Sequence, residues 1–170
     1  SGYQASCILT FVGIPTDMNI SGSVSPTGGA YKLGIGQDYV FDVEITNPFG
    51  SVGAEFNDFD CRVYGVGSVV LGYLERTSGV ENWYDEENET VTLDSLKDNF
   101  ISASYADGQL TVTTKRSVES YYSRMQKGDG GRTTFYWDKF RSYADDCYFK
   151  VRIEERTSGI SKELEIRFDD

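Results

Sequence analysis

Residues 147–168 read CYFKVRIEERTSGISKELEIRF, and this stretch decides the fold. Apolar residues occupy every second position on both sides of a Thr-Ser-Gly turn: Cys147, Phe149, Val151 and Ile153 before it, and Leu164, Ile166 and Phe168 after it. A period of two is typical of a β-strand with one buried and one solvated face. The stretch therefore predicts an antiparallel hairpin that packs one face on a core.

Similar strand patterns fill the rest of the chain. Residues 39–46 alternate between apolar and polar positions in the same way. Two strand-like runs at residues 100–105 and 109–115 flank Asp107-Gly108, whose preference for positive φ suits a two-residue type I′ hairpin. A composition with 12 Tyr, 10 Phe and 18 Gly also favours strands and tight turns over helices.

We therefore predict an all-β fold, an antiparallel β-sandwich of immunoglobulin-like architecture with at most one or two short helices. Two segments compete with a purely β interpretation. Residues 117–128 carry apolar side chains at helical spacing but also fit a strand, and residues 136–145 fit a single helical turn. Specific immunoglobulin markers are missing, because Asp145 stands where a Tyr two residues before Cys147 would be expected.

A near-repeat bears on domain organisation. Residues 75–80, ERTSGV, return as residues 155–160, ERTSGI, with five identities in six. The main prediction is a single β-sandwich unit over residues 1–170. The alternative is an internal duplication with one sandwich at 1–95 and a second at 96–170. Two hairpins that share the same turn chemistry would explain the match equally.

The charge and residue content of the chain exclude several classes of function. With 16 Lys and Arg against 27 Asp and Glu the net charge is −11, so we expect no nucleic-acid partner. The chain has no histidine, which removes Ser-His-Asp and Cys-His nucleophiles and His-ligated metals. We predict that the protein is not an enzyme. No apolar run reaches the ~20 residues of a membrane span.

Cysteines and sequons bear on the compartment. Cys7, Cys61 and Cys147 are the disulfide candidates, with one intramolecular bridge or buried thiols as the alternatives. Asn19 and Asn88 begin N-glycosylation sequons. We expect an extracellular or cell-surface location, with any signal peptide already removed.

Acidic clusters are the only candidates for metal binding, and we predict no cofactor. Calcium is the ion they would suit, because it takes several carboxylate and carbonyl oxygens, yet none reproduces the EF-hand loop. A solvated acidic loop is the other interpretation of each cluster. The clusters are Asp58/Asp60, Asp85/Glu86/Glu87, Asp94/Asp98 and Asp145/Asp146.

The leading functional hypothesis is a non-enzymatic structural or adhesive protein, whose partner is a second copy or a surface receptor. The apolar run at residues 7–12 could add a strand to the sheet edge of a neighbouring subunit in a filament or other assembly, and its assembly residues would be Ile8, Leu9, Phe11 and Val12. The alternative is a carbohydrate-binding module, since exposed aromatic rings stack on sugars. Its candidate platform is Tyr121, Tyr122, Tyr136 and Trp137.

Overall fold

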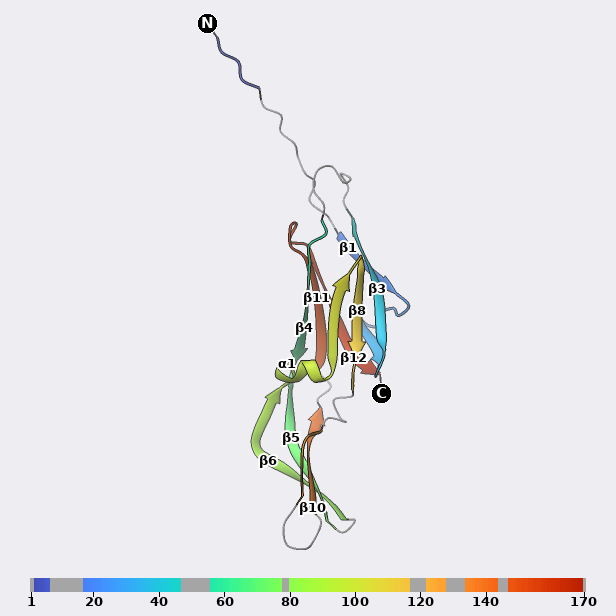
Figure 1. Cartoon of the computed structure of the whole chain (residues 1–170), viewed down its shortest axis with the longest axis vertical. Helices are drawn as coiled ribbons and strands as arrows, with labels where there is room; N and C mark the ends of the chain where they lie inside the picture. The colour runs from blue at the N-terminus through green and yellow to red at the C-terminus, as the bar shows by residue number, and fades with distance from the viewer. Residues whose placement is uncertain are drawn as a thin grey trace.

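Figure 1 shows the computed structural model of the chain, an elongated molecule built almost entirely of β-strands. The structure describes residues 2–6, 17–46, 56–77, 80–116, 122–127, 134–143 and 147–169. At residues 70–77, 80–89, 122–127 and 134–143 it describes the backbone alone. Within these ranges, twelve strands form three four-stranded sheets, called sheets A, B and C.

Sheet A is antiparallel throughout, with its strands in the order β1-β3-β8-β7. Its strands are β1 (Asp17–Gly22), β3 (Asp38–Thr46), β7 (Ile101–Ala106) and β8 (Gln109–Thr114). The predicted alternation in residues 39–46 is confirmed, because Phe41 and Val43 are buried while the neighbouring acids are exposed. Asp107 and Gly108 both have positive φ (49° and 80°), which confirms the predicted turn between β7 and β8.

Sheet B has the order β2-β12-β11-β4. Its strands are β2 (Ala30–Gly34), β4 (Phe59–Val66), β11 (Tyr148–Glu155) and β12 (Ser161–Asp169). The hairpin predicted from residues 147–168 is β11 and β12, and Phe149, Val151 and Ile153 are fully buried on its inner face. In contrast to the antiparallel prediction, β2 runs parallel to β12.

Sheet C lies beyond one end of the sandwich, at the bottom of Figure 1. Its order is β6-β5-β10-β9, with β5 (Ser68–Thr77), β6 (Val80–Thr92), β9 (Tyr122–Lys127) and β10 (Thr134–Tyr143). Strand β4 leads into β5 and β10 leads towards β11, so the antiparallel β4–β11 ladder of sheet B is followed by the antiparallel β5–β10 ladder of sheet C. We call these two ladders the spine, which runs from the Glu155–Phe59 pair to the Thr134–Thr77 pair.

The core lies between sheets A and B and is filled by apolar side chains from both. Phe149 stands at its centre, with its ring centroid 5.9 Å from that of Phe100 and 5.2 Å from that of Phe168. Burial of each large apolar side chain contributes about 1.5–3 kcal/mol. The core includes Met18, Phe41, Leu110 and Val112 of sheet A, Leu33, Phe149, Val151, Ile153, Leu164 and Ile166 of sheet B, and Leu93, Phe100 and Ile101.

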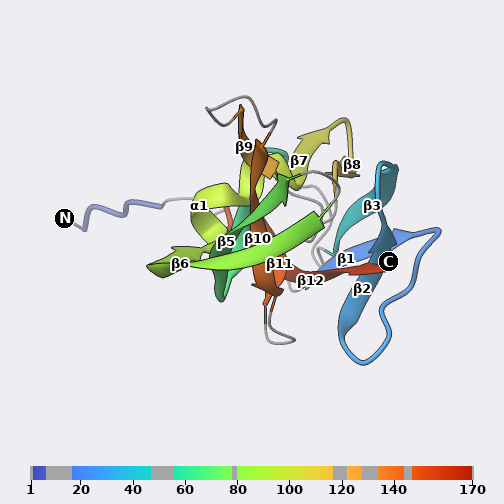
Figure 2. The same cartoon turned by 90° about the horizontal axis from the view of Figure 1, so that it is seen from below.

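This packing confirms the predicted all-β sandwich, and the immunoglobulin-like architecture stays a prediction. Each sheet combines two strands from before residue 95 with two from after it, so neither half of the chain contains a complete sheet. Seen from below in Figure 2, the strands of sheet C cross in front of the sandwich.

The described helical segments are short and few, as predicted, but they lie outside the two segments that fitted a helix by spacing. The described helical segments are α1 (Leu93–Leu96) and the 3₁₀ turn η1 (Lys97–Asn99). Residues 136–145 were expected to allow a helical turn, but Thr134–Tyr143 is strand β10, because it pairs on both sides with β5 and β9. Residues 122–127 take the strand alternative. The acidic cluster Asp85/Glu86/Glu87, for which a solvated loop was one interpretation, lies in strand β6.

A buried glutamate holds the end of the spine together. Glu155 is fully buried and accepts the backbone N–H of Ser158 at 2.7 Å and that of Asp58 at 3.1 Å. Its own backbone N–H donates to the carbonyl of Ile160, which closes the β11–β12 turn. Burial acts to raise the pKa of Glu155, but backbone N–H donors from Ser158, Thr157 and Asp58 outweigh it and lower this pKa below its usual value.

The two near-identical hexapeptides form hairpin ends of different length. In the first copy Thr77 pairs with Val80, so two residues connect β5 and β6. In the second copy Glu155 is the last paired residue and four residues, 156–159, complete the turn. Glu75 pairs with Asn82 two positions inside its ladder. The same residue types therefore serve two turns of different length.

The junction between sheets B and C is a close contact at Gly67. This residue joins β4 to β5 with a φ of +93°, and its carbonyl accepts the N–H of Leu93 at the start of α1. The buried thiol of Cys147 donates to the carbonyl of Ser68 at 3.4 Å. A Cβ atom on Gly67 would collide with the Cys147 sulfur. Only glycine fits both the conformation and the space.

Replacing Glu155 should remove a pH-dependent part of the stability. We expect Glu155→Gln to lower the free energy of unfolding by about 2 kcal/mol at pH 7, because the amide cannot replace a charged acceptor of backbone N–H groups. Since the folded-state pKa is lowered, the contribution is present above the unfolded pKa and is lost as pH falls through the folded pKa. Urea unfolding between pH 3 and 7 measures this difference. Glu154→Gln, at the half-buried neighbour on the solvated face, should leave the profile nearly parallel to the wild type.

Two glycine substitutions should separate the close contact at the junction from backbone conformation. Gly67→Ala should destabilise the protein by more than about 2 kcal/mol, whereas Gly108→Ala should cost about 1 kcal/mol. Both positions have positive φ, but a Cβ on Gly108 meets nothing within 4 Å. Thermal unfolding of the two variants provides the comparison. Equal losses would show that the contact with Cys147 adds nothing.

Candidate functional site

The structure does not describe the side chains of the four aromatic residues that the sequence suggested as a sugar platform. Tyr121 lies outside the described residues, and Tyr122, Tyr136 and Trp137 lie in β9 and β10, where the backbone alone is described. The ladder places Trp137 opposite Met125 and Tyr122 opposite Lys139. A sugar platform at these residues stays a prediction.

The cysteines occupy separate places. Cys7 lies outside the described residues. Cys61 and Cys147 are thiols and are not joined to each other. Cys61 pairs with Ile153, six residues along β11 from Cys147, which places the two cysteines about 20 Å apart along the strand, too far for a disulfide. Burial, with a smaller effect of the Asp60 charge, raises the pKa of the Cys61 thiol to about 11.

Of the proposed assembly residues and the two glycosylation sequons, the structure describes only part. Ile8, Leu9, Phe11 and Val12 lie outside the described residues. Asn19 is exposed on β1, where a sequon is accessible, while Asn88 lies in the part of β6 described by its backbone alone. Within the described ranges, no helix is long and apolar enough to span a membrane.

Three of the four cluster acids whose side chains are described, Asp58, Asp60 and Asp94, have protein partners. Asp60 accepts the guanidinium groups of Arg62 at 2.8 Å and Arg156 at 3.0 Å, and these hydrogen bonds lower its pKa. Asp94 accepts the N–H of Gly65 at 2.9 Å, which with Lys97 lowers its pKa. No group of three potential metal ligands occurs among the described side chains. The side chains of residues 85–87 and 145–146 are not among those that the structure describes.

Among the described strands, β1 is an edge of sheet A and pairs on one side only, with β3. Val43 donates its N–H to Gly108 on the β8 side, so its partner Ile20 makes no ladder bond with β3 and turns its main-chain groups to the open edge. Met18, two residues earlier, does the same. Its N–H is bound by the Asp17 carboxylate at 2.8 Å and its carbonyl by the Lys162 ammonium at 3.1 Å. Charged groups therefore block one end of this edge.

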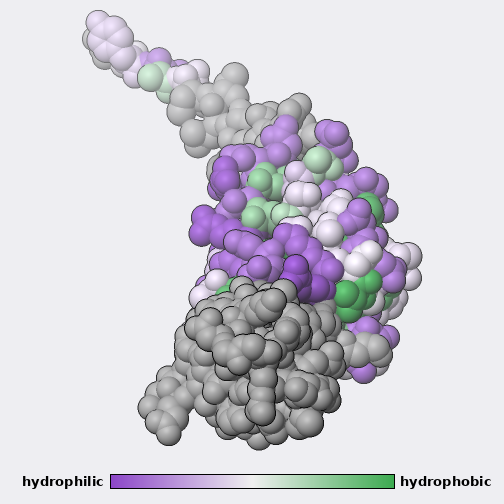
Figure 3. Space-filling view, turned by 60° about the horizontal axis from the view of Figure 1, so that its bottom comes forward, coloured by the Kyte–Doolittle hydropathy of each residue, from purple (hydrophilic) through white to green (hydrophobic). Residues whose placement is uncertain are grey.

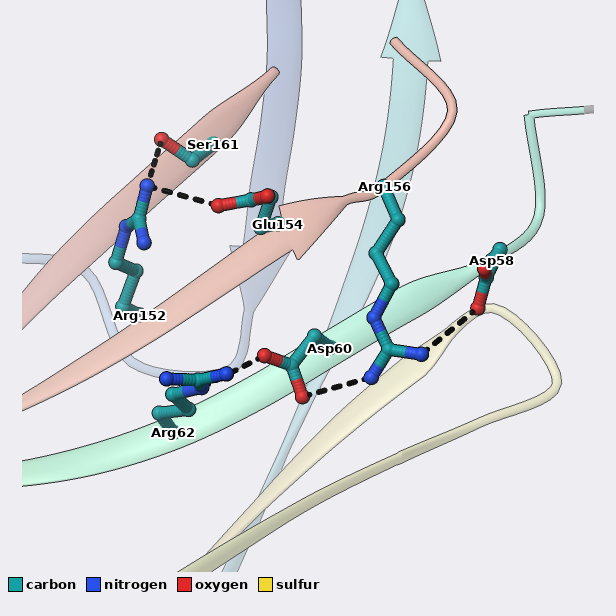
Figure 4. A network of polar contacts seen from close by, with 7 residues as sticks. All are labelled: Asp58, Asp60, Arg62, Arg152, Glu154, Arg156 and Ser161. Atoms are coloured by element: carbon teal, nitrogen blue, oxygen red, sulfur yellow. Dashed lines mark hydrogen bonds and ion pairs between the residues drawn. The ribbon is translucent and has the colours of Figure 1, made fainter. Parts of the chain in front are cut away.

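The outer face of sheet B carries the densest set of described charges, shown from close by in Figure 4. Arg62 of β4 stands directly opposite Arg152 of β11 in the ladder. Arg152 binds Glu154 at 2.8 Å and the Ser161 hydroxyl at 3.4 Å. Arg156 bridges Asp58 and Asp60. These contacts connect three neighbouring strands across the solvated face.

A hollow of about 590 Å³ opens on the same face beside α1. Polar and charged groups from β4, β11, β12 and α1 line it: Tyr64, Gly65, Val66, Asp94, Lys150, Arg152, Ser161 and Glu163. Lys150 binds Glu163 at 3.3 Å across the β11–β12 pair. The hollow thus combines two cations on one strand with acids at its margins, a tyrosine ring and a hydroxyl.

Sequence reasoning missed this hollow, although the alternation in residues 147–168 does assign Lys150 and Arg152 to the solvated face. The alternation does not give the β4–β11 register, which places Arg62 opposite Arg152, and it does not give the position of α1. Comparison with known protein families, with curated proteins and with solved structures finds no match to this chain. Only the geometry of the surface therefore bears on function.

The raised pKa of Cys61 should make this thiol a poor nucleophile. At pH 8 a pKa of about 11 leaves about one thiolate in a thousand. In a Cys7→Ser protein, we expect Cys61 to react with iodoacetamide on the order of a hundredfold more slowly when folded than in urea. Asp60→Asn should speed the reaction, because it removes a negative neighbour. Peptide mass mapping identifies the labelled cysteine, and equal folded and unfolded rates would contradict the shift.

Proposed function

We propose that this chain is a non-enzymatic structural or adhesive protein of an extracellular surface, which assembles through the edges of its β-sheets. The observation that carries the proposal is the edge of β1, where the main-chain groups of Ile20 and Gly22 are turned outward in the same alternation as those of Met18. An edge of this kind is a template for strand addition. The apolar run at residues 7–12 is the proposed donor.

The described surface supports assembly through main-chain hydrogen bonds between strands. It offers less support for association through an exposed apolar patch. Tyr3 and Val40 are the exposed large apolar residues among the described ones, and they do not adjoin in the sequence. Figure 3 shows mostly hydrophilic residues on the described part of one face, with apolar residues interspersed. Strand addition needs no large apolar patch, because backbone hydrogen bonds supply much of the affinity.

The elongated form supports a structural role. The spine consists of two successive ladders that belong to two sheets, so the sandwich and sheet C present their edges at different ends of the molecule. Heterologous contacts between such edges generate open filaments unless the rotation closes a ring. The absence of histidine and the high pKa of Cys61 add support for a non-enzymatic role.

Assembly through β1 should become stronger when the Lys162 ammonium, which binds the Met18 carbonyl, is removed. We expect light scattering to detect oligomers whose mass rises with concentration, and Lys162→Met to strengthen this association because it uncovers the Met18 carbonyl. Lys32→Met, which removes an equal charge from an exposed residue of β2, is the matched control. Deletion of residues 1–13 should leave a folded monomer. A wild-type protein that is monomeric at every concentration would contradict the proposal.

A further inference from the structure

The outer face of sheet B breaks a rule of strand pairing. Arg62 and Arg152 occupy directly opposite positions in the β4–β11 ladder, and Lys150 lies two residues from Arg152 on the same face of β11. Like charges placed directly opposite one another destabilise a sheet. On a chain with a net charge of −11, three cations are gathered where acids would have been easy to place. Local violations of this kind are expected at functional sites.

The carboxylates that accompany the three cations leave them available to a ligand. Arg62 pairs with Asp60, Arg152 with Glu154 and Lys150 with Glu163, through contacts of 2.8–3.3 Å. The side chains of Arg62, Arg152 and Lys150 are 65%, 37% and 31% exposed. Solvent-exposed ion pairs contribute little to stability, so a bound anion can replace a carboxylate at little cost.

Hydrogen-bond donors also remain in the hollow. Arg152 uses one nitrogen, Nη2, for both of its described contacts, and Lys150 makes one described contact, with Glu163. Among the described residues, nothing accepts from Nε or Nη1 of Arg152. A guanidinium group presents five donors in a fork that matches a carboxylate or sulfate. Lys150, about 7 Å along the strand, supplies a second cation for the same anion.

The other groups of the hollow suit a sugar ring. Tyr64 lies opposite Lys150 and offers an aromatic ring, while Ser161 and Asp94 supply acceptors for hydroxyl groups. A volume of about 590 Å³ lies within the range of small-ligand sites. Among the lining residues Val66 is the one aliphatic side chain, which favours a polar ligand over a peptide with apolar anchors.

We propose that the outer face of sheet B binds an anionic saccharide, whose carboxylate or sulfate group is held by Arg152 and Lys150, with Arg62 at the rim and Tyr64 against the ring. This site differs from the aromatic candidates in β9 and β10 and is independent of the β1 edge. A protein with a net charge of −11 repels polyanions as a whole, so retention of one would require a local site.

Titration calorimetry at low ionic strength tests the site with three probes. These are a trigalacturonate, a heparin-type sulfated tetrasaccharide and uncharged maltotriose. We expect at least one anionic probe to bind, maltotriose to be silent, and affinity to fall with added salt. Lys150→Gln/Arg152→Gln should reduce affinity at least tenfold. Lys32→Gln, at an exposed cation of the same sheet, should change it less than twofold.

Several outcomes would overturn the proposal. Failure of both anionic probes to bind the folded wild-type protein would mean that the cluster is a salt-bridge network only, as would unchanged affinity in the double variant. Equal competition by an acidic hexapeptide would overturn the assignment to a saccharide. Thermal unfolding of each variant, with a melting temperature close to that of the wild type, shows that a lost affinity comes from the site. Light scattering on the same samples reports assembly separately, so failure of one proposal leaves the other intact.

Discussion

The spine, made of the β4–β11 and β5–β10 ladders, is the constraint on which the rest of the structure depends. It is the element shared by the sandwich and sheet C, and every other strand of sheets B and C pairs with it directly or through one neighbour. The inner face of its upper half carries Phe149, Val151 and Ile153, around which sheet A packs. Its outer face carries the facing arginines of the proposed ligand site. Register along the spine therefore decides both the core and the surface.

Two sets of polar contacts fix that register. At one end, Glu155 accepts backbone N–H groups from its own turn and from the start of β4, so a slip of either strand would leave a buried carboxylate without donors. At the junction, Gly67 lets the chain turn past Cys147 while its carbonyl receives the first N–H of α1. Asp94 then covers the N–H of Gly65 at the edge of β4. Each of these contacts fixes the position of the chain at a place where the ladder hydrogen bonds end.

Alternation in the sequence predicted the hairpin β11–β12 and strand β3, because in each the side-chain period follows directly from one buried face. The Asp107-Gly108 turn was predicted from the preference of these residues for positive φ. Short-range patterns failed for residues 136–143 and for Asp85, Glu86 and Glu87, where helical spacing or charge outweighed a strand signal that depends on partners distant in the chain. The site shows the same division. Lys150 and Arg152 were assignable to a solvated face, but Tyr64, Asp94 and Arg62 join them only through pairing across 50 residues or more.

By itself, the sequence determined the class of the fold, the solvated and buried faces of its clearest strands, and the absence of histidine chemistry, since these follow from local residue order and composition. Only the tertiary structure decided the parallel pairing of β2 with β12, the third sheet, and the different turns made by the two ERTSG copies. It also decided which charges meet. The physical reason is that cross-strand register and layer packing are set by long-range contacts, whose energy is summed over the whole core and is not written in any single segment.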